Sequence, residues 1–300
     1  MLPKIMNMIV SERLSGRKTL FSLLLMVSFT HCKEPVEPEQ SFKSLRVEYK
    51  PIYSVDDILD IEDSLVAPVI YQGAVNLDAL PVDLKKKKFI DMMLPSILYV
   101  KYKMELVKNQ VEEIAAKQAL GLPVAPEEEE FLNEKLAAYK AADIDDLLEK
   151  LTTHPASIAL AQAALESGWG TSRFFREGHN VFGVWSYRAD ENRIMAGQSR
   201  NGRAVYVRKY DHFTGSIQDY FDTIARVKAY KNFRKMRKET DDAFELIPLL
   251  NRYSETGRAY VAQLKQMIHA NDLTKYDRYR LDPAYFVETP DPGTLIASVR

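Results

Sequence analysis

The segment from Pro155 to Gly170 constrains the fold of this chain most, because it joins a run of small residues to two closely spaced glycines. Pro155 is tolerated in a first helical turn, where its missing N–H would have no partner, and Thr153 is a candidate cap. Small and apolar residues recur at helical spacing as far as Leu165. This helix can therefore pack closely against others, and Gly168 and Gly170 are expected to end it.

The predicted helix places Glu166 in its last turn, with Trp169 just beyond it. The helix dipole disfavours a negative charge at that end. Packing against the indole would also desolvate the carboxyl and raise its pKa. A carboxyl that stays protonated can serve as a general acid. The alternative for one glutamate near a helix end is a solvated surface residue.

Two neighbouring motifs carry a family resemblance. Residues 161–174 read AQAALESGWGTSRF, and residues 178–185 read GHNVFGVW. They resemble the glucosaminidase family of peptidoglycan hydrolases, its Bax-like branch in particular, whose signature is A-x-x-E-S-x-W-G-x-S followed by N-x-F-G. The resemblance covers roughly residues 85–275 and continues through a late tyrosine motif, residues 253–261.

The resemblance implies an α+β, mainly α-helical, lysozyme-like catalytic domain in which a small β-hairpin lobe forms one wall of a groove. It also implies an exported endo-β-N-acetylglucosaminidase that cuts peptidoglycan glycan strands with Glu166 as general acid. Two alternatives stay open. One is a wall-binding or regulatory lipoprotein without turnover, and the other is a muramidase or lytic transglycosylase of the same fold. We expect a monomer that needs no cofactor.

Glycoside cleavage needs a second group that stabilises or captures the oxocarbenium-like centre. The family places a second acid on the hairpin, for which we predict Glu191, with Asp190 and Asp211 as further candidates. The alternative for all three is a solvated hairpin side chain. The family also places a tyrosine near the acid, where it orients the substrate's own N-acetyl group for attack. Tyr253 matches that tyrosine motif and is predicted as a catalytic residue.

Sugar rings bind flat apolar faces together with polar groups. The predicted substrate-binding residues cluster in the sequence around the acid: Trp169, Phe182, Trp185, Tyr187 and Asn180. Phe182 has a core position as its alternative, and Asn180 has a loop-fixing role as its alternative. The five histidines are scattered and the chain has one cysteine, so the sequence gives no support for a metal site.

The N-terminal 31 residues are predicted to be a signal peptide. Basic residues precede an apolar run, residues 20–29, that is too short to span a bilayer. Cys32 follows at once, and residues 33–40 are a polar, proline-punctuated tether. This order resembles a bacterial lipoprotein, so we expect lipidation of Cys32 and membrane attachment in the cell envelope, periplasmic or outer-membrane. His31 departs from the usual pattern, which leaves ordinary secretion or an uncleaved anchor as alternatives.

The rest of the chain divides by its patterning. Residues 32–82 are expected to be a tether and an irregular arm, and residues 83–152 a helical extension that packs on the catalytic domain, with one long helix or two kinked at Pro95. The catalytic domain would span residues 153–280 and a C-terminal tail residues 281–300. An Asn-Gly pair between strand-like runs predicts a β-hairpin within residues 187–210.

The charge of the chain gives no sign of a nucleic-acid partner. The net charge is −1, so no global field would attract a polyanion. The basic segment, residues 226–238, interleaves aromatic residues with lysines and arginines, a pattern that nucleic-acid binding also uses. For an exported protein we expect no nucleic acid. Attraction to the peptide carboxylates of the wall, or a plain solvated helix face, are the remaining interpretations.

Overall fold

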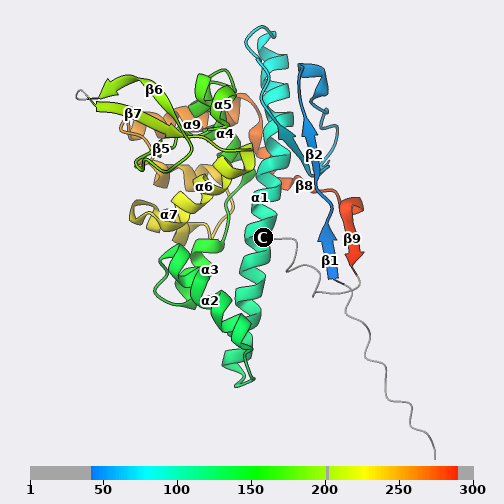
Figure 1. Cartoon of the computed structure of the whole chain (residues 1–300), viewed down its shortest axis with the longest axis vertical. Coiled ribbons are helices and arrows are strands. Elements are labelled where there is room, and N and C mark those ends of the chain that lie inside the picture. The colour runs from blue at the N-terminus through cyan, green and yellow to red at the C-terminus, as the bar shows by residue number, and fades with distance from the viewer. Residues whose placement is uncertain (1–41, 201–202, 290–300) are drawn as a thin grey trace, which may run out of the picture. The chain divides into compact units, whose positions relative to one another are not determined.

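The computed structural model describes residues 42–200 and 203–289 (Figure 1). The helices are α1 Val82–Ala119, α2 Pro126–Tyr139, α3 Ile144–Leu151, α4 Ala156–Ser167, α5 Arg173–Gly178, α6 Phe213–Arg226, α7 Lys231–Met236, α8 Ala243–Leu246 and α9 Arg258–Ala270. The strands are β1 Phe42–Leu45, β2 Glu48–Pro51, β3 Leu65–Val66, β4 Val69–Gln72, β5 Trp185–Ser186, β6 Arg193–Arg200, β7 Arg203–Arg208, β8 Arg280–Leu281 and β9 Phe286–Thr289. The predicted signal peptide, the lipidation site Cys32 and the Asn-Gly turn lie outside the described residues.

The predicted class, α+β and mainly helical with a small hairpin lobe, is confirmed. Strand β6 pairs antiparallel with β7, and the short β5 pairs with the other edge of β7, so the lobe has the order β5-β7-β6 (Figure 1). Asp190 and Glu191 were expected on an arm of the hairpin. They lie instead in the turn that leads from β5 into β6.

Helix α1 runs unbroken through Pro95, so the long-helix form of the prediction is correct. Its first half lies in the main core, beside α4 and α6. Its second half forms a separate small cluster with α2 and α3, which the buried residues Val111, Ile114, Leu132, Leu147 and Leu151 make up. Burial on several faces explains how a proline is tolerated here, because tertiary packing offsets the lost helical hydrogen bond.

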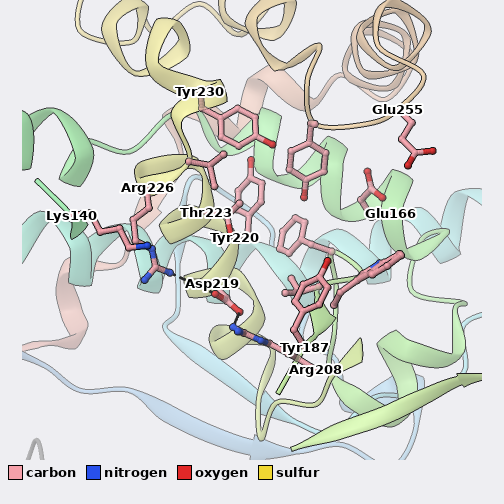
Figure 2. Close-up of a pocket in the computed structure, with 16 residues that line it drawn as sticks. Lys140, Glu166, Tyr187, Arg208, Asp219, Tyr220, Thr223, Arg226, Tyr230 and Glu255 are labelled. Atoms are coloured by element: carbon pink, nitrogen blue, oxygen red, sulfur yellow. Dashed lines mark hydrogen bonds and ion pairs between the residues drawn. The ribbon is translucent and has the colours of Figure 1, made fainter. Parts of the chain in front are cut away.

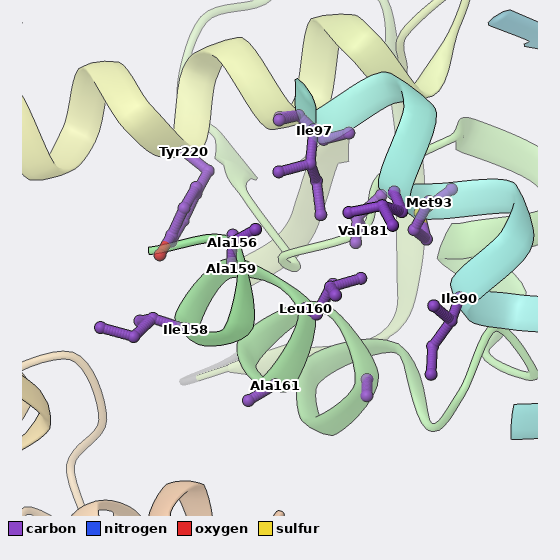
Figure 3. Close-up of a cluster of buried hydrophobic side chains, with 14 of the residues drawn as sticks. Ile90, Met93, Ile97, Ala156, Ile158, Ala159, Leu160, Ala161, Val181 and Tyr220 are labelled. Carbon is purple, nitrogen blue, oxygen red and sulfur yellow. The ribbon is translucent and has the colours of Figure 1, made fainter. Parts of the chain in front are cut away.

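Helix α4 lies at the centre of the main core. Ile158, Ala159 and Leu160 are fully buried, and they pack among α1 side chains such as Ile97 and against Tyr220 of α6 (Figure 3). Alanines on the remaining faces let neighbouring helices approach closely. A helix surrounded in this way is held by contacts on nearly every side, so its C-terminal end is a rigid platform.

Both ends of α4 have identifiable caps. Gly168 ends the helix in a left-handed conformation, φ 61°, as predicted. At the start, the expectation of a Thr153 cap is wrong, because the helix begins at Ala156 with Pro155 at the cap position. The carboxylate of Asp277, 120 residues away in the sequence, caps the helix instead. It accepts hydrogen bonds from the Ser157 backbone N–H and hydroxyl, each at 2.7 Å.

The N-terminal arm and the first residues beyond 280 are more regular than the sequence suggests. Strand β2 pairs parallel with β4, β3 pairs parallel with β8, and β1 pairs antiparallel with β9. Residues 281–289, expected to belong to a tail, are thus part of the fold. Apolar side chains of the arm, among them Ile58, Val66 and Tyr71, are buried in the main core. Within the described residues, none of the helices has the length and apolar character needed to cross a membrane.

The basic segment, residues 226–238, is partly structural. Arg234 and Arg237 are buried, which contradicts a uniformly solvated helix face. Arg234 donates to the carbonyl oxygens of Ile224 and Val227 at 2.9 and 3.0 Å. Arg237 donates to the carbonyl of Glu149 at 2.7 Å. Both side chains satisfy carbonyls that helices leave unpaired at their C-terminal ends.

Candidate active site

A groove with a volume of about 950 Å³ opens at the C-terminal end of α4. Seven parts of the chain line it: the end of α4, residues 182–187, Arg208 at the end of β7, one face of α6, Tyr230, the corner between α2 and α3, and the turn that holds Tyr253 and Glu255 (Figure 2). Glu166 lies at one end, and Lys140 and Arg226 lie at the other (Figure 2). The groove therefore combines an acid, aromatic faces and charged groups.

Glu166 is an exposed residue that lines this groove, and protein atoms surround its carboxyl group on the other sides. Burial raises the pKa of Glu166, and a hydrogen bond from Tyr260 partly opposes the rise. That bond runs from the Tyr260 hydroxyl to Oε1 over 2.8 Å. One carboxyl oxygen is thus held by a hydrogen bond from the protein, and no described residue donates to Oε2, so a proton on Oε2 is available to a molecule bound in the groove that Glu166 lines.

A chain of hydrogen bonds leads from the core to Glu166. Tyr260 accepts from Gln162 Nε2 at 3.0 Å, Gln162 Oε1 accepts from the Tyr220 hydroxyl at 2.6 Å, and His154 Nε2 lies 2.8 Å from that hydroxyl. Because Tyr220 gives its proton to Gln162, His154 must donate through Nε2, which fixes its tautomer. Every donor points toward Glu166, so the chain holds the carboxyl in one orientation.

Tyr253 packs directly against this series of hydrogen-bonded side chains. Its ring stacks on that of Tyr260, with centroids 5.5 Å apart and planes 14° from parallel. Burial raises the pKa of both hydroxyls far above the ordinary tyrosine value, so both remain protonated donors. Tyr253 lines the groove, and within the described part of the chain its hydroxyl has no hydrogen-bond partner. That hydroxyl is free to donate to a substrate.

Residues 142–273 match the family model described as mannosyl-glycoprotein endo-beta-N-acetylglucosaminidase. The resemblance to the glucosaminidase family is confirmed. Glu166, Tyr253 and Tyr260 all lie within the matched range. The helix α1 and the corner between α2 and α3 before residue 142 lie outside it.

Several bacterial proteins are similar to part of this chain. "Protein bax" of Escherichia coli is 31% identical over 134 residues, which are 42% of this chain and 46% of that protein. "Exo-glucosaminidase LytG" of Bacillus subtilis is 28% identical over 141 residues, 44% of this chain and 49% of that protein. The chain thus spans about half the length of these relatives. The catalytic domain of the Listeria monocytogenes autolysin Auto is 21% identical with a TM-score of 0.36, over 55% of this chain and 96% of that domain.

Three of the predicted sugar-binding residues, Phe182, Trp185 and Tyr187, line the groove. Trp185 and Tyr187 present open aromatic surface, with 39% and 83% of each residue exposed. Phe182 is buried and stacks on Tyr220, with centroids 4.2 Å apart and planes 11° from parallel. Trp185 and Tyr187 can therefore contact a sugar face. Phe182 mainly packs against Tyr220 and so stabilises the series of hydrogen-bonded side chains.

Trp169 and Asn180 are not brought into the groove. Trp169 has a positive φ of 58°, and this turn carries its indole onto α1, where it meets Phe89 edge-on with centroids 5.5 Å apart. It lines a separate small pocket beside α9. Asn180 is buried and bonds to the backbone of Val184 and Arg208, each time at 2.9 Å. Its position fits the loop-fixing alternative.

The acids of the hairpin also lie apart from Glu166. Glu191 accepts from the Ser186 hydroxyl at 2.6 Å and from Arg208 at 2.9 Å, and these contacts lower its pKa. It is held as a carboxylate outside the groove lining. Asp190 is paired with Arg188 at 2.6 Å. Two further acids line the groove with Glu166: Glu255, and Asp219, which accepts from the Tyr210 hydroxyl at 2.7 Å and is paired with Arg208 (Figure 2).

Sequence reasoning missed Gln162, Tyr260, Glu255 and Lys140. Gln162 had a usable signal, since it lies four residues before Glu166 on the same helix face and is the polar residue of an otherwise small and apolar run. Glu255 sits within the late tyrosine motif. Across residues 42–200 and 203–289, no group of three or more His, Cys, Asp or Glu side chains is arranged to hold a metal ion.

Proposed function

We propose that this chain is a peptidoglycan hydrolase, an exported endo-β-N-acetylglucosaminidase with Glu166 as its general acid. The observation that carries the proposal is the position of Glu166. Its carboxyl has a raised pKa, one oxygen accepts a hydrogen bond from Tyr260, and the residue lines a groove with open aromatic surface. The family match over residues 142–273 supports the same reaction class.

In the proposed reaction the proton on Oε2 of Glu166 passes to the glycosidic oxygen as the bond to the anomeric carbon breaks. The hydrogen bond from Tyr260 then stabilises the carboxylate that forms. In the return step this carboxylate takes a proton from the incoming water. The same residue therefore acts first as acid and then as base.

The positive charge that develops on the sugar needs a partner. Tyr253 lines the groove and stacks on the buried Tyr260. Its hydroxyl can hold the carbonyl oxygen of the substrate's N-acetyl group so that this oxygen attacks the anomeric carbon. For a direct second acid we assign Glu255 in place of Glu191, because Glu255 lines the groove at the same end as Glu166 (Figure 2), whereas Asp219, the other acid of the lining, is paired with Arg208. Glu191 then serves to hold Arg208 at the base of the hairpin.

The decisive experiment compares wild type with Glu166→Gln on purified peptidoglycan and identifies the products by mass spectrometry. We expect new reducing N-acetylglucosamine ends from wild type and none from the variant. Glu177→Gln, at an exposed residue of helix α5 outside the groove lining, is the matched control and should keep full activity. Undiminished cleavage by Glu166→Gln would overturn the assignment.

The same products separate the alternatives. Reducing N-acetylmuramic acid would indicate a muramidase, and an anhydro sugar would indicate a lytic transglycosylase. If wild type sediments with insoluble wall but releases no product, the chain is a wall-binding lipoprotein.

Export and lipidation form a separate part of the proposal, supported by the basic and apolar N-terminal pattern and by Cys32 directly after it. Labelling with a radioactive or clickable fatty acid in a bacterial host tests it. We expect label on wild type, with the protein in the membrane fraction. Cys32→Ala should lose both label and membrane attachment, and a variant that keeps them would refute lipidation at this residue.

A further inference from the structure

Lys140 lines the same groove as Glu166, although it lies before the range that matches the glucosaminidase family. It belongs to the corner between α2 and α3, so the helical extension supplies part of the groove wall. Lys140 and Arg226 lie together at the end opposite Glu166 (Figure 2). A substrate that reaches from Glu166 to this end would meet a lysine from outside the family segment.

The backbone at Lys140 is unusual for a lysine. It adopts a left-handed conformation, φ 49° and ψ 45°, at the end of α2, where glycine is the residue that fits without strain. Its carbonyl accepts from the ammonium of Lys150 at 2.7 Å, and Lys150 is itself buried and paired with Asp146 at 2.8 Å. The corner is thus fixed, and it holds a long cationic side chain at a position that disfavours one.

Lys140 also differs in charge balance from the other cations of the groove. Arg208 is paired with Glu191 at 2.9 Å and with Asp219. Arg226 lies 3.5 Å from a carboxylate oxygen of Asp222 and 3.8 Å from one of Asp219. Among the described residues, no carboxylate lies within ion-pair distance of the Lys140 ammonium. This end of the groove therefore presents an uncompensated positive charge beside a guanidinium with spare N–H donors.

We propose that Lys140, with Arg226 beside it, binds a carboxylate carried by the glycan strand, so that the groove selects strands with acidic substituents. This inference rests on the proposed function and specifies its substrate. Peptidoglycan offers two such carboxylates: those of the stem peptide where a muramic sugar carries one, and that of the lactyl group where the peptide has been removed. A charge-assisted hydrogen bond between ammonium and carboxylate is the contact that the site can make with either.

The test uses four glycans: peptide-bearing strands and strands stripped of peptide by an amidase, each with free carboxylates or with carboxylates converted to methylamides. Lys140→Gln should raise KM about fivefold on a glycan whose free carboxylate the site binds, with kcat little changed. It should leave KM unchanged on both amidated glycans. An effect on peptide-bearing strands alone assigns the stem peptide, an effect on stripped strands alone assigns the lactyl group, and an effect on both free glycans means that the site binds either carboxylate.

Three further variants guard against other causes. Lys140→Gly removes the same charge and relieves the left-handed strain, so it should unfold at the same or a higher temperature and still show the raised KM. Lys140→Arg should retain wild-type KM. Lys235→Gln, at an exposed lysine outside the groove lining, should change nothing.

An unchanged KM for Lys140→Gln, or a rise of equal size on amidated glycans, would overturn the proposal. If wild type cuts none of the four glycans, the proposed hydrolase activity fails on its own. Dissociation constants from sedimentation with the same glycans then decide the Lys140 question, with the same fivefold difference expected.

Discussion

The Tyr260 hydroxyl and Oε1 of Glu166 are 2.8 Å apart, with the hydroxyl as donor. This contact joins the end of α4 to α9 across the groove wall, and it divides the two oxygens of the carboxyl into one that is held and one that can react. Gln162 and Tyr220 stand behind it in the same chain of donors. Orientation of the acid is thus built from three helices.

Tyr260→Phe should alter the pH dependence of the reaction. In the wild type, the hydrogen bond from Tyr260 favours the carboxylate form of Glu166. Removing this hydrogen bond therefore raises the pKa of Glu166 further. Because the protonated form is the active one, activity is lost as the pH rises through this pKa. The alkaline limb of the kcat profile should therefore move to higher pH, while kcat at its maximum falls about tenfold from poorer orientation. A profile that keeps its alkaline limb in place would argue against the contact.

Glu166→Gln should stabilise the protein at neutral pH. The folded state raises the pKa of Glu166 above its unfolded value, so the ionised form is disfavoured by folding and lowers stability at a pH above both values. Glutamine keeps the shape and the acceptor for Tyr260 without the charge. Thermal unfolding should show a higher Tm for the variant at pH 7, and the difference should shrink as the pH falls below about 4. An equal or lower Tm at pH 7 would contradict the raised pKa.

Glu255→Gln and Glu191→Gln should separate the two candidate second acids. Loss of an acid that acts on the reacting sugar should reduce kcat about a hundredfold or more, and we expect this for Glu255→Gln. Glu191→Gln weakens an ion pair with Arg208 at the hairpin and should lower activity about threefold or less, since partly exposed pairs contribute little. The opposite order of effects would return the catalytic role to Glu191.

Asp277→Ala should destabilise the fold without changing the chemistry. The carboxylate satisfies the Ser157 backbone N–H and hydroxyl at the start of α4, and loss of such a cap costs about 1–2 kcal/mol. Denaturant unfolding measures this change, while kcat per folded molecule should stay at the wild-type value. Asp277→Asn keeps one acceptor and should lose less stability. Equal losses in both variants would mean that charge, and not capping, is what matters.

Local features of the sequence were predicted well, and distant partners were not. The end of α4 follows from Gly168 itself, and the hairpin follows from strand-like runs around a turn, because each depends on neighbouring residues. The start of α4 was assigned to Thr153, since nothing local reveals that Asp277 reaches it from 120 residues away. The arm strands were missed for the same reason, because their partners lie at the other end of the chain.

The candidate site divides in the same way. Glu166, Trp185, Tyr187 and Tyr253 belong to motifs that the resemblance covers, and the structure brings them to one groove. Trp169 belongs to the same motif, but its backbone turn directs it onto α1. Tyr260 acts on Glu166 across 94 residues of sequence, so the contact becomes visible only when α4 and α9 are packed together.

The pairing of β1 with β9 and of β3 with β8 sets the order in which this protein can be completed. Each pair joins strands more than 200 residues apart, and β8 and β9 follow helices α1 to α9 in the sequence, so they are synthesised after them. Contacts over such separations form slowly because a long loop must close first. Helices α1 to α9 can pack together before β1 and β3 pair with β9 and β8. A chain that stops before Phe286 would leave β1 with an unpaired edge, open to pairing with other chains.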